Sequence, residues 1–228
     1  MLRRWRFRKR CRGLAEGCRE ASLAAYLSGC AELRPTDVVG TPMIAVDLEL
    51  TGLDAAKDHI ISVGWTLVDD GRIRLGSNRH VLVSADRSVG ESAAIHELTD
   101  SEVAEGVKLR KALKKLFEAA AGRVWVFHHA SLDVSFLQRA CRGWAGLAPP
   151  FAVLDTMQIE LGLRKRRDQP VQQGDLQLSR LRSDYGLPRY TAHNALIDAL
   201  ATAELLLAIA ARLNQKTPME IGPYLRFI

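Results

Sequence analysis

The stretch Ile44-Ala-Val-Asp47-Leu-Glu49-Leu-Thr-Gly52 decides the fold of this chain and holds its most unusual side chains. The apolar run from Met43 predicts a strand over 43–50, and residues two apart in a strand share a face, so Asp47 and Glu49 project side by side. A uniformly apolar run is typical of a central strand covered on both faces. Two carboxylates there repel one another and lose hydration unless a cation compensates. Oxygen ligands of this kind suit Mg²⁺ or Mn²⁺.

The alternative is that the strand ends at Val46 and both acids face water in a loop. This segment alone leaves both interpretations open. Two later segments favour the metal interpretation. His128-His-Ala-Ser-Leu-Asp133 follows an apolar run and places an acid where a helix begins, and His193-Asn-Ala-Leu-Ile-Asp198 opens the last long helix. Taken singly, Asp133 is an ordinary acid at a helix start, and Asn194 is an ordinary N-cap that leaves His193 on the preceding loop.

Along the rest of the chain, the hydrophobic periodicity predicts an α/β protein with a mixed sheet and helices outside it. Asp69-Asp70-Gly71 predicts a hairpin turn between the second and third strands. The stretch 164–174 is polar and predicts a loop. Strands are expected over 43–50, 59–69, 72–84, 123–127 and 151–154, and helices over 13–33, 107–121, 133–143, 175–185 and 194–214.

The positive charge is concentrated at the start of the sequence. The 228 residues include 32 Lys and Arg against 26 Asp and Glu, a net charge of +6. Residues 1–12 hold seven basic residues and no acid, which leaves 25 basic and 26 acidic residues, or −1, elsewhere. Because Trp5 and Phe7 alternate with arginines, this arm could combine phosphate contact with base stacking. The alternative is a disordered solubilising tail.

Other classes are excluded by composition. No uncharged apolar run reaches the about 18 residues that a membrane span needs. The four cysteines, Cys11, Cys18, Cys30 and Cys141, fit neither a zinc pattern nor a disulfide framework, so we expect reduced thiols and a cytoplasmic location.

Together the motifs resemble the DEDD superfamily of 3′–5′ exonucleases, in the subgroup with histidine in the third motif. Within it the chain is most similar to the proofreading exonuclease (epsilon) subunits of bacterial DNA polymerase III. The resemblance runs from about Thr41 to Leu213 and implies a ribonuclease-H-like fold with a five-stranded mixed sheet. It divides the chain into an exonuclease domain, 41–228, and a basic, helical extension, 1–40. The segments that match the family are Asp47–Asp54, Ile95–Thr99, His128–Asp133, Asp155-Thr156 and His193–Asp198.

The resemblance also implies the roles of five residues. Asp47, Glu49, Asp133 and Asp198 would hold two divalent ions, Mg²⁺ or Mn²⁺, and His193 would be the general base. Two such ions can activate a water and stabilise the charge on the scissile phosphate and the leaving 3′ oxygen. A neutral histidine suits the proton transfer because its ordinary pKa lies near neutrality. The implied reaction releases 5′-mononucleotides from the 3′ end of single-stranded DNA.

Departures from the family pattern concern the substrate. Leu50 replaces the usual Thr, Glu97 the usual Gly, His129 the usual Asn and Leu132 the usual Phe. The first motif also resembles oligoribonucleases, so an RNA-trimming or oligoribonucleotide-degrading enzyme is an alternative. A binding module without catalysis is a third, which the presence of all five chemical positions disfavours. We expect nucleotide contacts at Leu50, Thr51, His96 and His129. For His96, His128 and His129, pocket-lining or hydrogen-bonded positions near the sheet edge are favoured over a metal-ligand role.

Partners follow from the same reasoning. The run Arg164-Lys-Arg-Arg167 predicts phosphate contacts at Arg164 and Arg166, because a polyanion needs cations to hold its backbone. A solvated surface is the alternative for this run. We expect single-stranded DNA or RNA 3′ ends as partners, with a DNA polymerase or repair complex as a further candidate. Only 14 residues follow Asn214, so a free-standing exonuclease is the simpler expectation.

Overall fold

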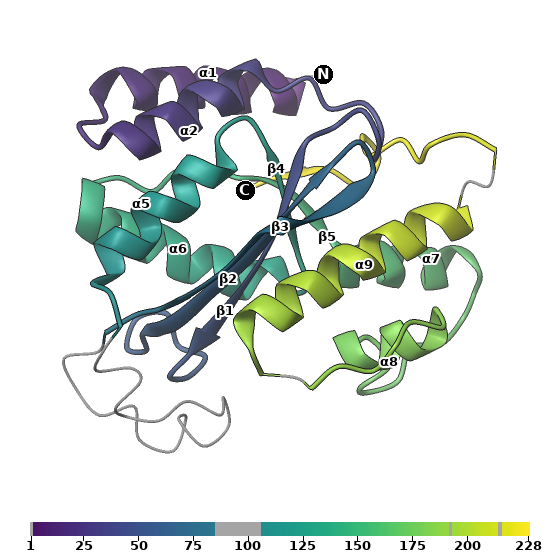
Figure 1. The fold of residues 1–228 in the computed structure, drawn as a ribbon. Helices are drawn as coiled ribbons and strands as arrows, with labels where there is room; N and C mark the ends of the chain where they lie inside the picture. The colour runs from purple at the N-terminus through teal and green to yellow at the C-terminus, as the bar shows by residue number, and fades with distance from the viewer. Residues whose placement is uncertain (1, 85–105, 192, 214–215) are drawn as a thin grey trace.

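A mixed six-stranded sheet runs through the centre of the protein (Figure 1). The computed structural model describes residues 2–84, 106–191, 193–213 and 216–228. Neighbouring strands follow the order β3-β2-β1-β4-β5-β6, with β1 parallel to β4 and β4 parallel to β5, and with the other pairs antiparallel. The strands are β1 (Met43–Leu50), β2 (Ile60–Asp69), β3 (Arg72–Leu82), β4 (Val124–Phe127), β5 (Ala152–Asp155) and β6 (Arg226–Phe227).

The first three strands have the bounds that the apolar pattern predicts, within two residues. β1 lies between β2 and β4, which explains why nearly every one of its residues is buried. Asp70 and Gly71 both have positive φ, 55° and 67°, as the two central residues of a tight hairpin turn require. The expected hairpin between β2 and β3 is therefore confirmed.

Helices cover both faces of the sheet (Figure 1). The long α9 packs on β1, β2 and β3, with α7 and α8 beside it, while α5 and α6 pack on the other side. α2 packs on α5, and α1 packs on α2 and β6. The helices are α1 (Leu2–Gly17), α2 (Ala21–Glu32), α5 (Leu109–Ala120), α6 (Ala130–Ala145), α7 (Thr156–Arg166), α8 (Leu178–Asp184) and α9 (Ala195–Leu213).

The two N-terminal helices share the main hydrophobic core. Tyr26 of α2 is fully buried, donates its hydroxyl to the carbonyl of Pro150 at 2.9 Å, and accepts from the indole Nε1 of Trp125 at 3.1 Å. Phe7 of α1 is buried against Phe227, with ring centroids 4.6 Å apart. Burying aromatic rings of this size supplies a large share of core stability.

Four expectations about elements were wrong. The residues predicted as an arm followed by one helix form two helices that break at 18–20, so the disordered-tail alternative is wrong for residues 2–12. Because Phe7 is buried in the core, it is not available to stack on bases. Residues 156–166 form α7, so the predicted loop begins only after Arg166. The sheet has six strands instead of five, because the two-residue β6 pairs with β5.

No helix in the described part of the chain is both long enough and apolar enough to cross a membrane.

Candidate active site

Three carboxylates from two elements meet at the carboxyl end of β1. Asp47 and Glu49 come from β1, and Asp198 comes from the first turn of α9. One oxygen of each lies within 4.8 Å of the others. Glu49 is buried, and Asp47 and Asp198 are partly exposed. Hard oxygen donors at this spacing, in a largely dehydrated setting, fit a divalent cation.

Asp133 lies near this cluster, on the first turn of α6, where it is buried and its charge acts on Asp47, although its oxygens are not among the three within 4.8 Å. The start of α6 is held by Asp155 at the end of β5. The buried carboxylate of Asp155 accepts backbone N–H groups from His129 and Ala130, at 3.2 and 3.0 Å. It also caps its own helix, accepting from Met157 and Gln158 at 3.0 and 3.2 Å. One side chain thus fixes two helix starts, and with them the position of Asp133.

Burial raises the pKa of all four carboxyls, and repulsion from neighbouring carboxylates adds to it for Asp47, Glu49 and Asp133. Burial is the larger cause for Asp47, whose pKa lies well above its ordinary value, and the charges of Asp133, Glu49 and Asp198 add to it. Burial, with a further contribution from Asp198, raises the pKa of Glu49 to about 7. Burial also raises the pKa of Asp133 to about 8, although the backbone amides of Asp133 and Leu48 oppose it. The pKa of Asp198 is raised by burial and lowered in part by the backbone amide of His193.

These shifts predict how stability depends on pH in the absence of metal. A carboxyl whose pKa is higher in the folded state binds more protons there, so folding stability falls as pH rises from the unfolded value to the folded one. For Glu49 and Asp133 that window runs from their ordinary values, 4.5 and 3.8, up to about 7 and 8. We expect the melting temperature in chelator to fall between pH 5 and pH 8, and Mn²⁺ to raise it more at pH 8 than at pH 5. Calorimetry at matched ionic strength checks this, and an equal Mn²⁺ effect at both pH values would contradict it.

His193 lies on the loop just before α9. Asn194 caps the helix, since its side-chain oxygen accepts the N–H groups of Leu196 and Ile197 at 3.1 and 3.3 Å, which confirms the predicted cap. His193 is exposed, has φ of 70°, and donates its backbone N–H to Asp198 Oδ2 at 2.9 Å. A positive φ is uncommon for a histidine and marks a constrained loop. The hydrogen bond ties that loop to the carboxylate cluster.

A pocket of about 680 Å³ opens over Asp47, His193 and Asp198. Its other wall is formed by α8 and the loop that follows, including Arg180, Arg189 and Tyr190, which the motif reasoning did not identify. Their only signal in the sequence is that cationic and aromatic residues precede His193.

Arg182 fastens this wall to α9. It is 3% exposed, and its guanidinium donates to the carbonyls of Ala201 and Pro188 at 2.9 and 2.8 Å. It also pairs with Glu204 at 2.7 Å and lies over the Tyr190 ring, 4.3 Å from its centroid. The loop that carries His193 therefore begins at a fixed point.

The predicted substrate contacts are more scattered. Leu50 is buried, and Thr51 Oγ1 accepts the backbone N–H of His59 at 2.9 Å. His129 is exposed just before α6, whereas His128 is held by Thr156 Oγ1 and the carbonyl of Leu176 at 2.8 and 2.9 Å. His96 lies outside the described residues.

The two arginines predicted to hold phosphate have other partners. Arg164 pairs with Glu160, Asp175 and Asp184 at 3.2, 3.3 and 2.9 Å. Because its side chain is 13% exposed and its guanidinium is shared by three carboxylates, this position supports a structural role instead of a phosphate contact. Arg166 lies over the ring of Tyr224, and neither arginine lines the pocket over the carboxylates.

A carboxylate cluster at the end of a central strand, facing a helix that crosses a mixed sheet, defines a ribonuclease-H-like nuclease domain. The chain belongs to the exonuclease (RNase T) family, whose profile matches residues 44–206.

Similar proteins agree with this family. The chain is 26% identical over 176 residues to the 3′–5′ exonuclease DinG of Staphylococcus haemolyticus. This alignment covers 77% of this chain and 19% of that protein. It is 26% identical over 199 residues to a DNA polymerase III subunit epsilon-like protein of Rhodobacter capsulatus, covering 86% of this chain and 28% of that protein. The fold resembles that of E. coli Exonuclease I in complex with a dT13 oligonucleotide, with a TM-score of 0.62 and 13% sequence identity. The superposition covers 75% of this chain and 41% of the Exonuclease I chain. The chain thus spans less than a third of these curated relatives.

Proposed function

We propose that this chain is a metal-dependent 3′–5′ exonuclease that acts on single-stranded DNA and releases 5′-mononucleotides. The observation that carries the proposal is the convergence of Asp47, Glu49 and Asp198 within 4.8 Å, with the buried carboxyl of Asp133 electrostatically coupled to Asp47 and Glu49. The family match and the fold shared with an Exonuclease I bound to an oligonucleotide support it. Association with a DNA polymerase is a further proposal, supported by the epsilon-like relative.

In this proposal, different residues of the chain would bind the metal ions, accept the proton and contact the phosphates. The four carboxylates would hold two divalent ions, Mg²⁺ or Mn²⁺, which supply Lewis-acid activation of water and charge stabilisation at the phosphate. His193, on the exposed loop beside Asp198, would accept the proton of the attacking water. Arg180 and Arg189, across the pocket, would contact phosphates of the entering strand.

The test uses purified protein with strands labelled at the 5′ end, in DNA and RNA forms, with Mg²⁺ or Mn²⁺ and then with excess chelator. We expect the DNA to shorten stepwise from its 3′ end, 5′-mononucleotides to accumulate, and chelator to stop the reaction. A strand with a blocked 3′ end is the matched control and should persist. Faster shortening of RNA would support the ribonuclease alternative, and intact strands in every arm, with folded protein, would overturn the enzyme proposal.

A further inference from the structure

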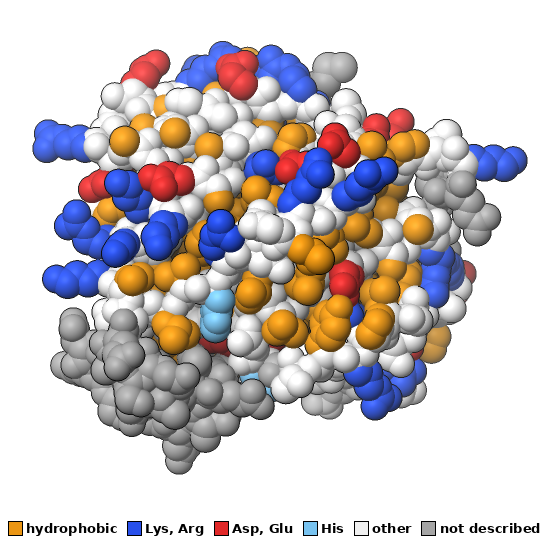
Figure 2. All heavy atoms as spheres, viewed as in Figure 1, with side chains coloured by type: hydrophobic (Ala, Val, Ile, Leu, Met, Phe, Trp, Pro, Cys, Tyr) orange, Lys and Arg blue, Asp and Glu red, His pale blue; other side chains and the backbone are white. Residues whose placement is uncertain are grey.

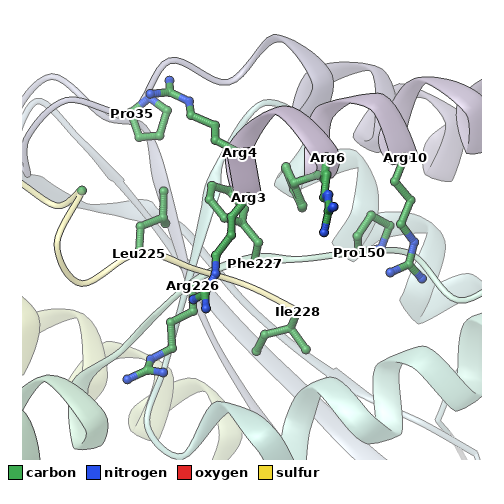
Figure 3. Close-up of a pocket in the computed structure, with 12 residues that line it drawn as sticks. Arg3, Arg4, Arg6, Arg10, Pro35, Pro150, Leu225, Arg226, Phe227 and Ile228 are labelled. Carbon is green, nitrogen blue, oxygen red and sulfur yellow. The ribbon is translucent and has the colours of Figure 1, made fainter. Parts of the chain in front are cut away.

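A second charged feature lies at the opposite end of the sheet from the carboxylates. A pocket of about 880 Å³ is lined by α1, by the residues around β6, and by Pro35 and Pro150 (Figure 3). Pro150 lies two residues before the start of β5. Since β5, β4 and β1 run parallel, this pocket lies beyond the amino ends of these strands. Five arginines and no acidic residue line it: Arg3, Arg4, Arg6, Arg10 and Arg226.

The arginines of α1 fall into two sets. Arg4, Arg8 and Arg12, spaced four apart, turn toward the end of α2, where they donate to the carbonyls of Leu33 and Ala31 and to the Glu32 carboxylate. Arg3, Arg6 and Arg10 lie on another side and point toward the pocket, while Arg226 lines it from β6 and extends away from α1 (Figure 3). Among the described residues, none of these four guanidinium groups has an ion pair or a side-chain hydrogen bond. The first set fixes the helix, and the second is available to a ligand.

The pocket is built on a rigid element. Phe7 and Cys11 are buried beneath α1, and Phe7 packs on Phe227. Because α1 is anchored in this way, the backbone that carries these arginines is fixed before any ligand arrives, which reduces the entropy lost on binding. Arg3 stands in the first turn, where the helix dipole favours acids, and unlike Arg4 it has no side-chain partner among the described residues. Its position is better explained by an anionic ligand.

We propose that this arginine pocket binds the phosphate backbone of a nucleic-acid strand at a point remote from the 3′ end held by the carboxylates. This inference rests on the proposed function. Residues 3, 6 and 10 form a row about 10 Å long at 1.5 Å per residue, which matches several successive charges of a polyanion better than one small ion. The planar guanidinium fork suits phosphate oxygens, which it can bind in pairs.

The strand has a charged surface to follow between the two ends. α5 begins after Val107, which pairs with Val83 at the carboxylate end of the sheet, and it ends before β4 at the other end. Lys and Arg side chains gather over and beside this helix (Figure 2). Its exposed cations are Lys108, Arg110, Lys111, Lys114 and Lys115. Met43 and Glu49 mark the two ends of β1 and lie about 20 Å apart, at about 3.3 Å per residue. A nucleic-acid strand with stacked bases rises about 3.4 Å per nucleotide, so it needs at least about six nucleotides to reach both sites.

The experiment measures binding in chelator, so it does not depend on hydrolysis. Fluorescence anisotropy compares labelled thymidylate strands of 4 and 24 nucleotides on the wild-type protein and on the triple variant Arg3→Gln, Arg6→Gln, Arg10→Gln. The control triple variant, Arg72→Gln, Arg142→Gln, Lys216→Gln, removes the same charge from exposed positions outside the pocket. Both variants should keep the wild-type melting temperature, because the altered side chains have no ion pairs or side-chain hydrogen bonds among the described residues.

We expect the pocket variant to bind the 24-mer at least about tenfold more weakly than wild type at low salt. The slope of the logarithm of the binding constant against the logarithm of salt concentration should become shallower by about 2, at about 0.7 for each of the three lost phosphate contacts. Binding of the 4-mer should not change, and neither should binding of either strand to the control variant. Equal weakening in both variants would overturn the proposal, because it would reflect net charge alone. The proposal would also be overturned if polyglutamate displaced the labelled 24-mer at a lower concentration of negative charge than unlabelled 24-mer does. That result would favour an acidic protein partner. Failure of the exonuclease assay with retained length-dependent binding would refute the proposed activity and leave this site standing.

Discussion

Asp198→Ala is expected to lower the turnover number on single-stranded DNA by at least about a thousandfold. In the proposed mechanism, metal-assisted stabilisation of the phosphate and the leaving group supplies most of the catalysis. Asp198 contributes one of the three oxygens that lie within 4.8 Å of each other. Glu118→Ala is the matched control, since Glu118 is an exposed acid on α5 away from the cluster. Rates measured by mononucleotide release at saturating Mn²⁺ check the expectation, and an unchanged turnover number would show that this carboxylate does not take part.

The same substitution should leave the metal-free protein as stable as wild type, or more stable. Removing one charge relieves the repulsion that raises the pKa of Asp47 and Glu49. The gain should grow as pH rises toward 8, where more of the wild-type carboxyls are ionised. Asp198→Asn separates charge from geometry, since its amide oxygen can still accept the His193 N–H that Asp198 accepts now. We expect this variant to be inactive and to keep the wild-type loop, which would assign the loss to the missing ligand charge.

The sequence identifies these acids through the order and spacing of three motifs, and only the first motif stands against its local pattern. A pair of carboxylates in an apolar strand is costly, so Asp47 and Glu49 stand out without any structure, whereas Asp198 is identified by the order of the motifs and the family resemblance. The contacts that bring them together leave no such mark. Asp155 is an unremarkable acid in the sequence, and only the fold shows it fixing the starts of α6 and α7.

The elements that were predicted wrongly have physical reasons. The run Arg164-Lys-Arg-Arg167 has no apolar period, yet Arg and Lys are good helix formers, and cations near a helix end are favourable. They lie in the last turn of α7. In α1 the dense arginines obscured a buried stripe of Phe7 and Cys11, which has helical spacing. High charge density favours an exposed arm, yet one face of this helix lies in the core.

A single glycine places α9 close enough to β1 for Asp198 to join the cluster. Gly64 of β2 pairs directly with Asp47 in the sheet. A Cβ built on Gly64 would lie 2.1 Å from the carbonyl carbon of Ala195 and 2.2 Å from the backbone nitrogen of Leu196. Both atoms belong to the backbone of the first turn of α9, so no side-chain rotation can relieve the contact. The absence of a side chain at this position allows the helix to touch the sheet.

Gly64→Ala is therefore expected to lift the start of α9 and to move Asp198 away from Asp47 and Glu49. Overpacking of this kind costs about 1–3 kcal/mol or more of stability, and a displacement of about 1 Å at a catalytic group can cost about a hundredfold in rate. We expect a lower melting temperature, a loss of the Mn²⁺-induced stabilisation, and a turnover number reduced about a hundredfold. Gly76→Ala is the control, because an added Cβ there meets no atom within 4 Å. If Gly64→Ala kept the melting temperature, metal response and turnover of Gly76→Ala, the close approach of α9 would not be what assembles the site. A selective loss in Gly64→Ala would make this backbone contact as necessary to the cluster as the carboxylates themselves.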